Sequence, residues 1–381
     1  MLPYGKQDIV QTDINAVLDV LKSDFLTQGP KVPLFEKSVS DYCGAKYGIA
    51  VNSATSALHI ACLALCLEKG DWLWTSPNSF VASANCGLYC KAKVDFIDID
   101  AQTYNISVDK LEKKLIQAKK ENKLPKVVIP VHFSGQSCDM RGIYKLSKKY
   151  GFKIIEDASH AIGGKYLDKP IGGCQYSDIT IFSFHPVKII TTAEGGMATT
   201  NNVQLAEKMN LYRSHGITRD KRLMKKSLNE SWYYQQIDLG FNYRMTELQA
   251  ALGISQMKRL DGFIKKRHIA ISAYNSLLRT APVILPKQDS DCYSSGHLYV
   301  VRILNSAPFD RNKVFKRLRI NNIGVNVHYI PIYRQPYYSK FGYNYHDFPE
   351  TEKYYSEAIT IPLFPTITWQ HQCSIVKEFL G

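Results

Sequence analysis

The 381-residue chain is predicted to be an α/β protein, with a large domain built on a mainly parallel sheet and a smaller C-terminal α+β domain. Two observations predict this fold. Between about residues 45 and 210, short β-branched and apolar runs alternate with helical patterns, the rhythm of strands joined by helical crossovers. Near residue 245 that rhythm gives way to a long helical stretch followed by short mixed elements. We therefore expect a large domain over 1–250, N-terminal segment included, and a small domain over 251–381.

The first half of the chain supplies most of the expected sheet. Apolar runs of buried-strand length occupy residues 47–51, 72–75, 94–99, 126–131, 152–156 and 179–184. Helices are expected over 55–67 and 79–89. A third helix follows Ser107, a candidate N-cap, because Val108, Leu111 and Leu115 fall on one helical face.

The second half of the chain begins with the long helical stretch. Thr246 is its candidate cap, and the apolar pattern continues to about Leu278. Further elements are expected as strands over 298–303 and 325–330 and as helices over 311–319 and 369–380. A long helix that bridges two domains leaves a cleft between them, which is a usual place for a small-molecule site.

Composition excludes several classes of protein. With 45% hydrophobic and 22% charged residues, the chain is neither disordered nor collagen-like nor a disulfide miniprotein. The net charge of +14 favours an anionic partner, either nucleic acid, a membrane surface or a phosphorylated small molecule. Most lysines are spread along helices and no nucleic-acid-binding motif is present, so nucleic acid is not expected.

Targeting and metal signals are also missing from the sequence. No apolar segment has the length of a membrane span, and the N-terminus has no apolar signal core. The nine cysteines form no CxxC pair and no cluster with histidine. We expect a reduced cytoplasmic protein without a bound metal and without membrane association.

A run of small hydroxylic residues, Asn52-Ser53-Ala54-Thr55-Ser56, joins a predicted strand directly to a helix. Free backbone N–H groups and the positive end of the helix make such a turn suitable for a phosphate. The alternative is that Ser53 or Thr55 only caps the helix.

A second segment, residues 154–160, places Asp157 just past a buried strand. A carboxylate there is costly unless it meets a cation, so it would pair with an arginine, bind a metal or hold a protonated heterocycle. The metal interpretation lacks partner ligands. For His160, in the same segment, the simplest interpretation is a hydrogen-bonded polar residue at the start of a helix.

A third segment, residues 180–188, places Ser183 and Lys188 on one strand-to-turn stretch. An amine among apolar neighbours such as Val187 and Ile189 loses its proton more easily, as a Schiff-base nucleophile requires. The alternative is an ordinary lysine whose amine reaches solvent.

Together these three segments are what pyridoxal 5′-phosphate (PLP) requires, namely a phosphate turn, an acid for the pyridine nitrogen and an amine for the aldehyde. Phe80, at another strand-to-helix turn, is the candidate ring to cover the cofactor. Competing phosphate motifs of the types GxGxxG and GxxxxGK[ST] are absent.

Several motifs occur in one order, namely NSATSAL, SFVASAN, EDASHAIG, SFHPVKIITTAEGG, YRSHG, FNYRMTELQAALG and VHYIPIY. They resemble the DegT-type nucleotide-sugar aminotransferases over nearly the whole chain, from Tyr4 to about Phe364. The resemblance implies the aspartate-aminotransferase-like architecture, PLP fold type I.

The resemblance also implies roles around PLP. Lys188 would bond to the aldehyde and Asp157 would keep the pyridine nitrogen protonated. Phe80 would stack on the ring, and His160, where many relatives have glutamine, would contact a cofactor oxygen. The implied phosphate ligands are Ala54, Thr55, Ser183 and, from the other subunit of a homodimer, Asn242.

The implied reaction transfers an amino group from L-glutamate, leaving 2-oxoglutarate, to C4 of a UDP-linked 4-keto-6-deoxy-N-acetylhexosamine, a step of pseudaminic acid biosynthesis. Arg213 and Arg244 are further candidates for the diphosphate. The residues implied for the sugar nucleotide are Tyr4, Asp24, Phe25, Leu26, Thr27, Asn326, Val327, His328 and Tyr329.

Three alternatives remain open. The same chemistry would serve another nucleotide-linked keto sugar, such as a UDP-D-gluco, GDP or dTDP compound. A related sugar dehydratase has histidine in place of the lysine, so Lys188 argues against it. A non-enzymatic regulatory protein on the same fold would not need Asp157, Ser183 and Lys188 together.

Overall fold

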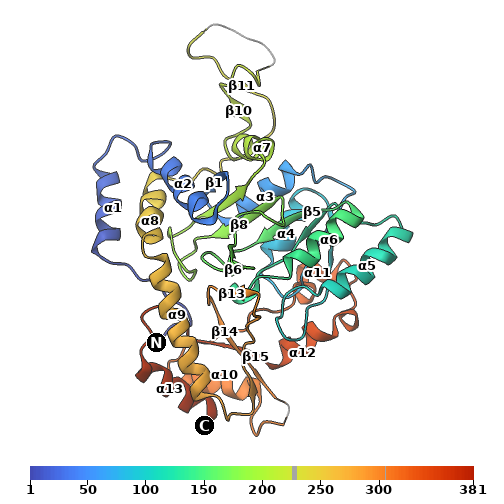
Figure 1. The fold of residues 1–381 in the computed structure, drawn as a ribbon, viewed down its shortest axis with the longest axis vertical. Helices are drawn as coiled ribbons and strands as arrows, with labels where there is room; N and C mark the ends of the chain where they lie inside the picture. The colour runs from blue at the N-terminus through green and yellow to red at the C-terminus, as the bar shows by residue number, and fades with distance from the viewer. Residues whose placement is uncertain (225–229, 305) are drawn as a thin grey trace.

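The computed structural model describes residues 1–224, 230–304 and 306–381. Its centre is a seven-stranded sheet with helices on both faces (Figure 1). In spatial order the strands are β1 (Tyr47–Val51), β9 (Gly196–Thr200), β8 (Ile179–Ser183), β5 (Lys153–Asp157), β4 (Val127–Ile129), β2 (Trp72–Thr75) and β3 (Lys93–Phe96).

The direction of the strands decides where a site can form. All neighbouring pairs from β8 to β3 are parallel, and only β9 runs antiparallel to both of its neighbours, β1 and β8. The strand β1 therefore points the same way as β8, β5 and β2, so their carboxyl ends share one edge. The predicted α/β fold with a mainly parallel sheet is confirmed.

Two helical layers bury the sheet. On one face α3 (Ala54–Ala64), α4 (Ala82–Tyr89) and α7 (Val203–Arg213) pack against a core that includes Ile155 and Ile181. The helices of the other face are α2 (Lys31–Cys43), α5 (Val108–Lys120), α6 (Met140–Tyr150) and α8 (Glu247–Met257). A further helix, α1 (Gln11–Leu21), lies on the outside of α8.

The C-terminal part has its own core around a three-stranded sheet, in the order β12 (Val283–Ile284), β14 (Tyr299–Ile303) and β15 (Ala358–Ile361). Its helices are α10 (Arg311–Ile320), α11 (Pro336–Ser339), α12 (Pro349–Glu357) and α13 (Trp369–Leu380).

The helix α9 (Leu260–Leu277) joins the two cores, because Phe263 packs in the core of the large sheet and Tyr274 in that of the small one. The N-terminal residue Leu2 lies beside Ile323 of the small unit. We keep the division at about residue 250 as a proposal.

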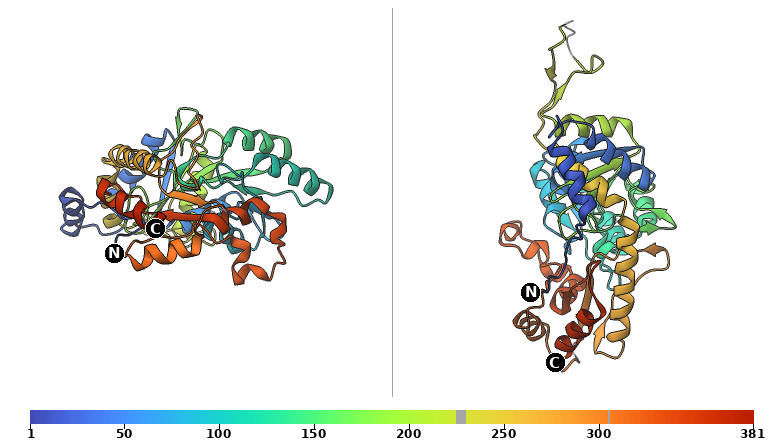
Figure 2. Two further views of the ribbon diagram at one scale, coloured as in Figure 1. Left: turned by 90° about the horizontal axis from the view of Figure 1, so that it is seen from below. Right: turned by 90° about the vertical axis from the view of Figure 1, so that its left-hand side faces the viewer.

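Short strand pairs complete the fold. One small sheet joins β13 (Cys292–Tyr293), β6 (Lys165–Tyr166) and β7 (Lys169–Pro170). The pair β10 (Ile217–Thr218) and β11 (Gln235–Gln236) projects from the body at the end opposite both chain termini (Figures 1 and 2). Among the described residues, no helix has both the length and the apolar character needed to cross a membrane.

The structure corrects the prediction of one long helix from Thr246 to about Leu278. Thr246 does cap α8, but the helix stops and α9 begins at Leu260. Arg259 occupies the break, where its guanidinium pairs with Asp8 and Asp13 of the N-terminal segment at 2.6 and 2.9 Å. These ion pairs connect the N-terminal segment to the helix junction.

The predicted strand over 325–330 is also wrong. Only Asn326 makes a bridge to a strand, with Thr360 of β15. Beyond it, the backbone N–H of Tyr329 donates to the Asn78 side chain at 3.1 Å instead of to a neighbouring strand. The segment leaves the sheet because its contacts are with the loop that follows β2.

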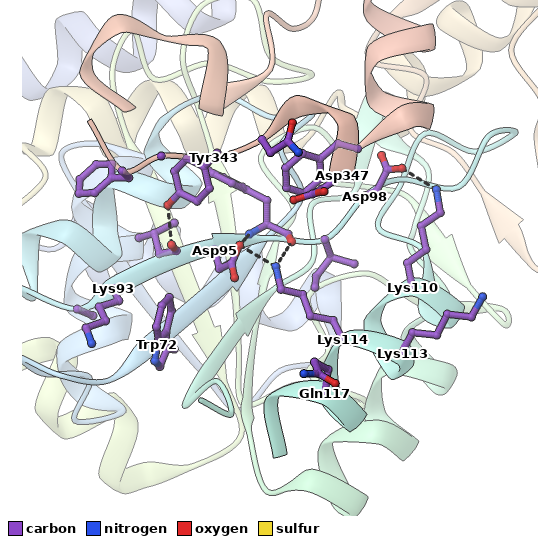
Figure 3. Close-up of a pocket in the computed structure, with 18 of the residues that line it drawn as sticks. Trp72, Lys93, Asp95, Asp98, Lys110, Lys113, Lys114, Gln117, Tyr343 and Asp347 are labelled. Carbon is purple, nitrogen blue, oxygen red and sulfur yellow. Dashed lines mark hydrogen bonds and ion pairs between the residues drawn. The ribbon is translucent and has the colours of Figure 1, made fainter. Parts of the chain in front are cut away.

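A cavity of about 820 Å³ lies along the outer edge of β3, between α5 and the segment 341–348 (Figure 3). Side chains satisfy the edge carbonyls here, since Tyr343 donates to Val94 O at 2.6 Å and Lys114 to Phe96 O at 2.8 Å. Lys114 and Lys110 are also paired, with Asp95 and Asp98. These contacts protect the edge from pairing with another strand.

Candidate active site

The shared carboxyl edge of the sheet carries a cavity of about 880 Å³. Segments after β1, β2, β5 and β8 meet there, as expected for ligand sites in open α/β sheets. The predicted site residues that line it are Tyr4, Ala54, Thr55, Phe80, Asp157, His160, Ser183, Lys188, Asn326, His328 and Tyr329.

The N-terminus of α3 forms one wall of this cavity. Ser53 caps the helix, accepting the Ser56 N–H at 3.1 Å, so the capping alternative applies to Ser53. The N–H groups of Ala54 and Thr55, the first two helical residues, have no acceptor within the helix. A Cβ on Gly196 of β9 would lie 2.5 Å from Ala54 N, so only glycine lets β9 approach this turn. The wall therefore offers free donors to a phosphate.

The end of β5 separates two acids, because successive side chains of a strand point to opposite faces. Glu156 is buried and meets His132 Nε2 at 2.7 Å. This contact and others from hydroxyls hold the pKa of Glu156 below its usual value despite burial. Asp157 lines the cavity, and no arginine or histidine among the described residues forms an ion pair with it. It is therefore available to a protonated ring nitrogen.

Lys188 lies in the same cavity, in the loop after β8. Burial lowers its pKa to about 8, although the nearby Asp157 carboxylate opposes that shift. At pH 7, an amine with a pKa of about 8 is roughly 10% neutral, against well under 0.1% for ordinary lysine. Lys188 can therefore act as a nucleophile near neutral pH.

This lowered pKa predicts a pH profile for the apoprotein. An amine-specific acylating reagent should modify Lys188 at a rate that rises up to about pH 8 and then levels off, since only the neutral amine reacts. Peptide-level mass spectrometry measures the rate, with N-acetyl-lysine in the same mixture as the reference amine. A Lys188 profile that keeps rising to pH 10, like that of the reference, would contradict the assignment.

A neutral histidine, His160, fixes a tyrosine in the cavity. His160 Nδ1 accepts the Ser134 N–H at 3.3 Å, so Nε2 carries the hydrogen and donates to the Tyr329 hydroxyl at 3.1 Å. Burial first, and then the charges of Lys188 and His328, hold the pKa of His160 well below its usual value. The Tyr329 hydroxyl hydrogen is consequently free to donate to a ligand.

Two of the further histidines that line the cavity, His297 and His328, are buried. His328 meets the Thr360 hydroxyl at 2.9 Å, and burial next to Lys188 lowers the pKa of His328 to about 3. The His297 ring packs against the His160 ring at a tilt of 41°, with ring centroids 4.4 Å apart, and His297 Nδ1 has no partner among the described residues. No local pattern marks His297, and the sequence analysis missed it.

Some predicted site residues lie outside the cavity. Val327 does not line it, and neither do the exposed residues of 24–27. Asn242 is exposed and also absent from its own chain's cavity. Arg213 is engaged elsewhere, by the Glu36 carboxylate and by Ala50 O. Within one chain, therefore, the structure does not bring these residues to the other predicted site residues.

The residues present fit PLP. An acid that forms no ion pair with an arginine or histidine of the described residues, an amine that readily loses its proton and free N–H groups of a helix line one cavity. Within the described part of the chain, no group of three or more histidine, cysteine or acidic side chains is arranged to hold a metal. Fold and site together define a PLP-dependent aminotransferase of fold type I.

Comparison with known proteins gives the family. The chain belongs to the DegT/DnrJ/EryC1/StrS aminotransferase family, whose sequence profile matches residues 7–380. It is 40% identical over 341 residues to the UDP-4-amino-4,6-dideoxy-N-acetyl-beta-L-altrosamine transaminase of Campylobacter jejuni, covering 89% of this chain and 86% of that protein.

Two more proteins are similar over most of their length. The spore coat polysaccharide biosynthesis protein SpsC of Bacillus subtilis is 38% identical over 371 residues, covering 96% of this chain and 93% of SpsC. The structure of Helicobacter pylori PseC, an aminotransferase involved in the biosynthesis of pseudoaminic acid, superposes with a TM-score of 0.89 at 32% identity. It covers 100% of this chain and 98% of PseC.

Proposed function

We propose that this enzyme transfers the amino group of L-glutamate to C4 of a UDP-linked 4-keto-6-deoxy-N-acetylhexosamine, forming UDP-4-amino-4,6-dideoxy-N-acetyl-beta-L-altrosamine for pseudaminic acid biosynthesis in the cytoplasm. Sugar amination in general is supported by the relatives and the structural neighbour. The particular sugar is supported by the Campylobacter jejuni transaminase, at 40% identity.

One observation carries the proposal, namely the composition of the cavity. Beside Asp157 and Lys188, its walls include Tyr4, Asn326 and Tyr329, which come from the N-terminus and the small unit. Tyr4 packs on the His328 ring with centroids 5.3 Å apart. These polar and aromatic groups provide a second subsite suited to a sugar nucleotide.

When bound, PLP supplies an aldehyde that accepts amino groups and a ring that withdraws electrons. Lys188 Nζ would hold the cofactor through its aldehyde. The same Nζ then takes the proton from the α-carbon of glutamate in the first half-reaction and delivers a proton to sugar C4 in the second. Asp157 would hold the protonated ring nitrogen, and the α3 N-terminus and Ser183 would hold the phosphate. Tyr329 donates a hydrogen bond inside the cavity.

A homodimer with shared active sites is part of the proposal. Asn242 is exposed, although the family resemblance gives it a phosphate contact, so it would reach the site of a second copy. Apolar side chains exposed on the same chain support such a contact, among them Leu239 at 73% and Trp232 at 67% exposure. The mass of the protein in solution tests the dimer.

The main alternative is the same reaction on another nucleotide-linked keto sugar. The protein SpsC supports it, since SpsC is 38% identical to this chain and is named for spore coat polysaccharide biosynthesis. The dehydratase alternative is disfavoured by Lys188. A non-enzymatic regulatory protein would not require a lysine with a lowered pKa beside a carboxylate.

The experiment is a product analysis by mass spectrometry. Protein with PLP, glutamate and the UDP-linked 4-keto-6-deoxy-N-acetylhexosamine of L-arabino configuration should yield an aminated UDP-sugar, whereas Lys188→Ala should yield none. Parallel reactions contain the D-gluco epimer and a dTDP-linked ketone. If one of these is aminated faster, the proposed sugar is wrong and the enzyme class stands. If glutamate does not change the cofactor's absorbance, the enzyme class itself is contradicted.

A further inference from the structure

The first turn of α4 lies directly behind Asp157. Ser83 Oγ donates to Asp157 Oδ2 at 2.6 Å, in a contact from which solvent is excluded. The Ser83 side chain is completely buried and does not line the cavity, and Asp157 is 5% exposed. Ser83 therefore touches the acid from the side away from the ligand.

A second hydroxyl supports the first. Ser79 Oγ lies 2.9 Å from Ser83 Oγ, and Ser79 is also buried. Because Ser83 donates its single hydroxyl hydrogen to the carboxylate, Ser79 must be the donor in the hydrogen bond between the two serines. The result is a directed chain of hydrogen bonds from Ser79 through Ser83 to Asp157.

The other carboxylate oxygen is fixed as well. Asp157 Oδ1 accepts the backbone N–H of Ser159 at 3.1 Å. With one donor on each oxygen, the plane of the carboxylate is set by the protein before any ligand binds. Hydrogen bonds to a charged group are also stronger than neutral ones.

We propose that Ser83, supported by Ser79, is a positioning residue that orients the Asp157 carboxylate toward the cofactor's ring nitrogen. This inference rests on the proposed role of Asp157. The same turn begins next to Phe80. The start of α4 therefore positions both the Asp157 carboxylate and the Phe80 ring proposed to cover the cofactor.

The test compares Ser83→Ala with the wild-type holoenzyme. Removing the hydroxyl should slow the half-reaction with glutamate roughly 10- to 100-fold, the range expected for one hydrogen bond to a charged group. The glutamate concentration for half-maximal rate should change less than about twofold, because Ser83 does not line the cavity. Ser79→Ala removes the supporting donor and should cause a smaller loss in the same direction. Because Ser79 also lines the cavity, the half-maximal glutamate concentration of Ser79→Ala is compared with that of Ser83→Ala.

A spectroscopic readout separates this role from a purely structural one. With PLP labelled with ¹⁵N in the ring, the nitrogen resonance of Ser83→Ala should move toward its deprotonated position, because a carboxylate that is no longer held in orientation makes a poorer hydrogen bond to the ring N–H. Ser147→Ala is the matched control, since that buried hydroxyl donates only to Tyr144 O on α6. It should change neither the resonance nor the rate.

The outcomes distinguish the two proposals. An unchanged rate and resonance in Ser83→Ala, with Lys188→Ala still inactive, would overturn the role of Ser83 and leave the proposed function intact. A wild-type protein that shows no cofactor resonance in its bound position would overturn the proposed function. A slow Ser83→Ala variant whose resonance matches the wild type would assign Ser83 to packing and also overturn the inference.

Discussion

Replacing Lys188 with alanine is expected to abolish amination, with a loss of turnover of at least about ten-thousand-fold. The variant lacks both the amine that holds the cofactor and the base that moves the proton, and no other lysine lines the cavity among the described residues. The aminated UDP-sugar, quantified by mass spectrometry, is the measure.

Lys188→Arg is the informative companion variant. It keeps a long basic side chain, but a guanidinium stays protonated and cannot act as a neutral nucleophile. We expect it to be as inactive as Lys188→Ala. Lys119→Ala, on the exposed side of α5, is the control and should keep full activity. Turnover above about a tenth of wild type in either Lys188 variant would refute the assignment.

Asp157→Asn is expected to have the second largest effect, a fall in kcat of roughly a hundred- to a thousand-fold, as for other electrostatic groups aimed at a reacting centre. The amide has nearly the same shape but no charge, so the ring nitrogen loses the anion that holds its proton. Steady-state kinetics with saturating PLP measure kcat and the KM for each substrate separately.

The charge and not the shape should determine this loss. Asp168→Asn, a similar exchange at an exposed turn, is the control for general effects of the substitution. KM for glutamate should change little, because Asp157 is directed at the cofactor. A kcat within about threefold of wild type would show that Asp157 does not act on the ring nitrogen.

Much of the fold could be predicted because its signals are local. The strand Trp72–Thr75 and the helix Trp369–Leu380 have the predicted bounds, and Ser107 and Thr246 are caps as expected. The small hydroxylic residues of 52–56 and the lysine among apolar neighbours after a strand likewise indicated the phosphate turn and the lysine loop.

The remaining features depend on contacts between distant segments. The break near Arg259 follows from ion pairs to residues about 250 positions earlier, which no local pattern records. The pattern of 325–330 predicts a strand, yet the segment leaves the sheet, where the Tyr329 N–H donates to the Asn78 side chain. Ser83 looks like an ordinary helix residue until the fold brings Asp157 within 2.6 Å of it.

Attachment of the cofactor to Lys188 underlies every step proposed for this cavity. It is tested most directly by reducing the holoenzyme with borohydride, digesting it and locating the added cofactor mass by peptide sequencing. We expect the mass on the peptide that contains Lys188, and its disappearance when the enzyme is first saturated with glutamate. Cofactor mass on a different lysine, or on none, would contradict the account.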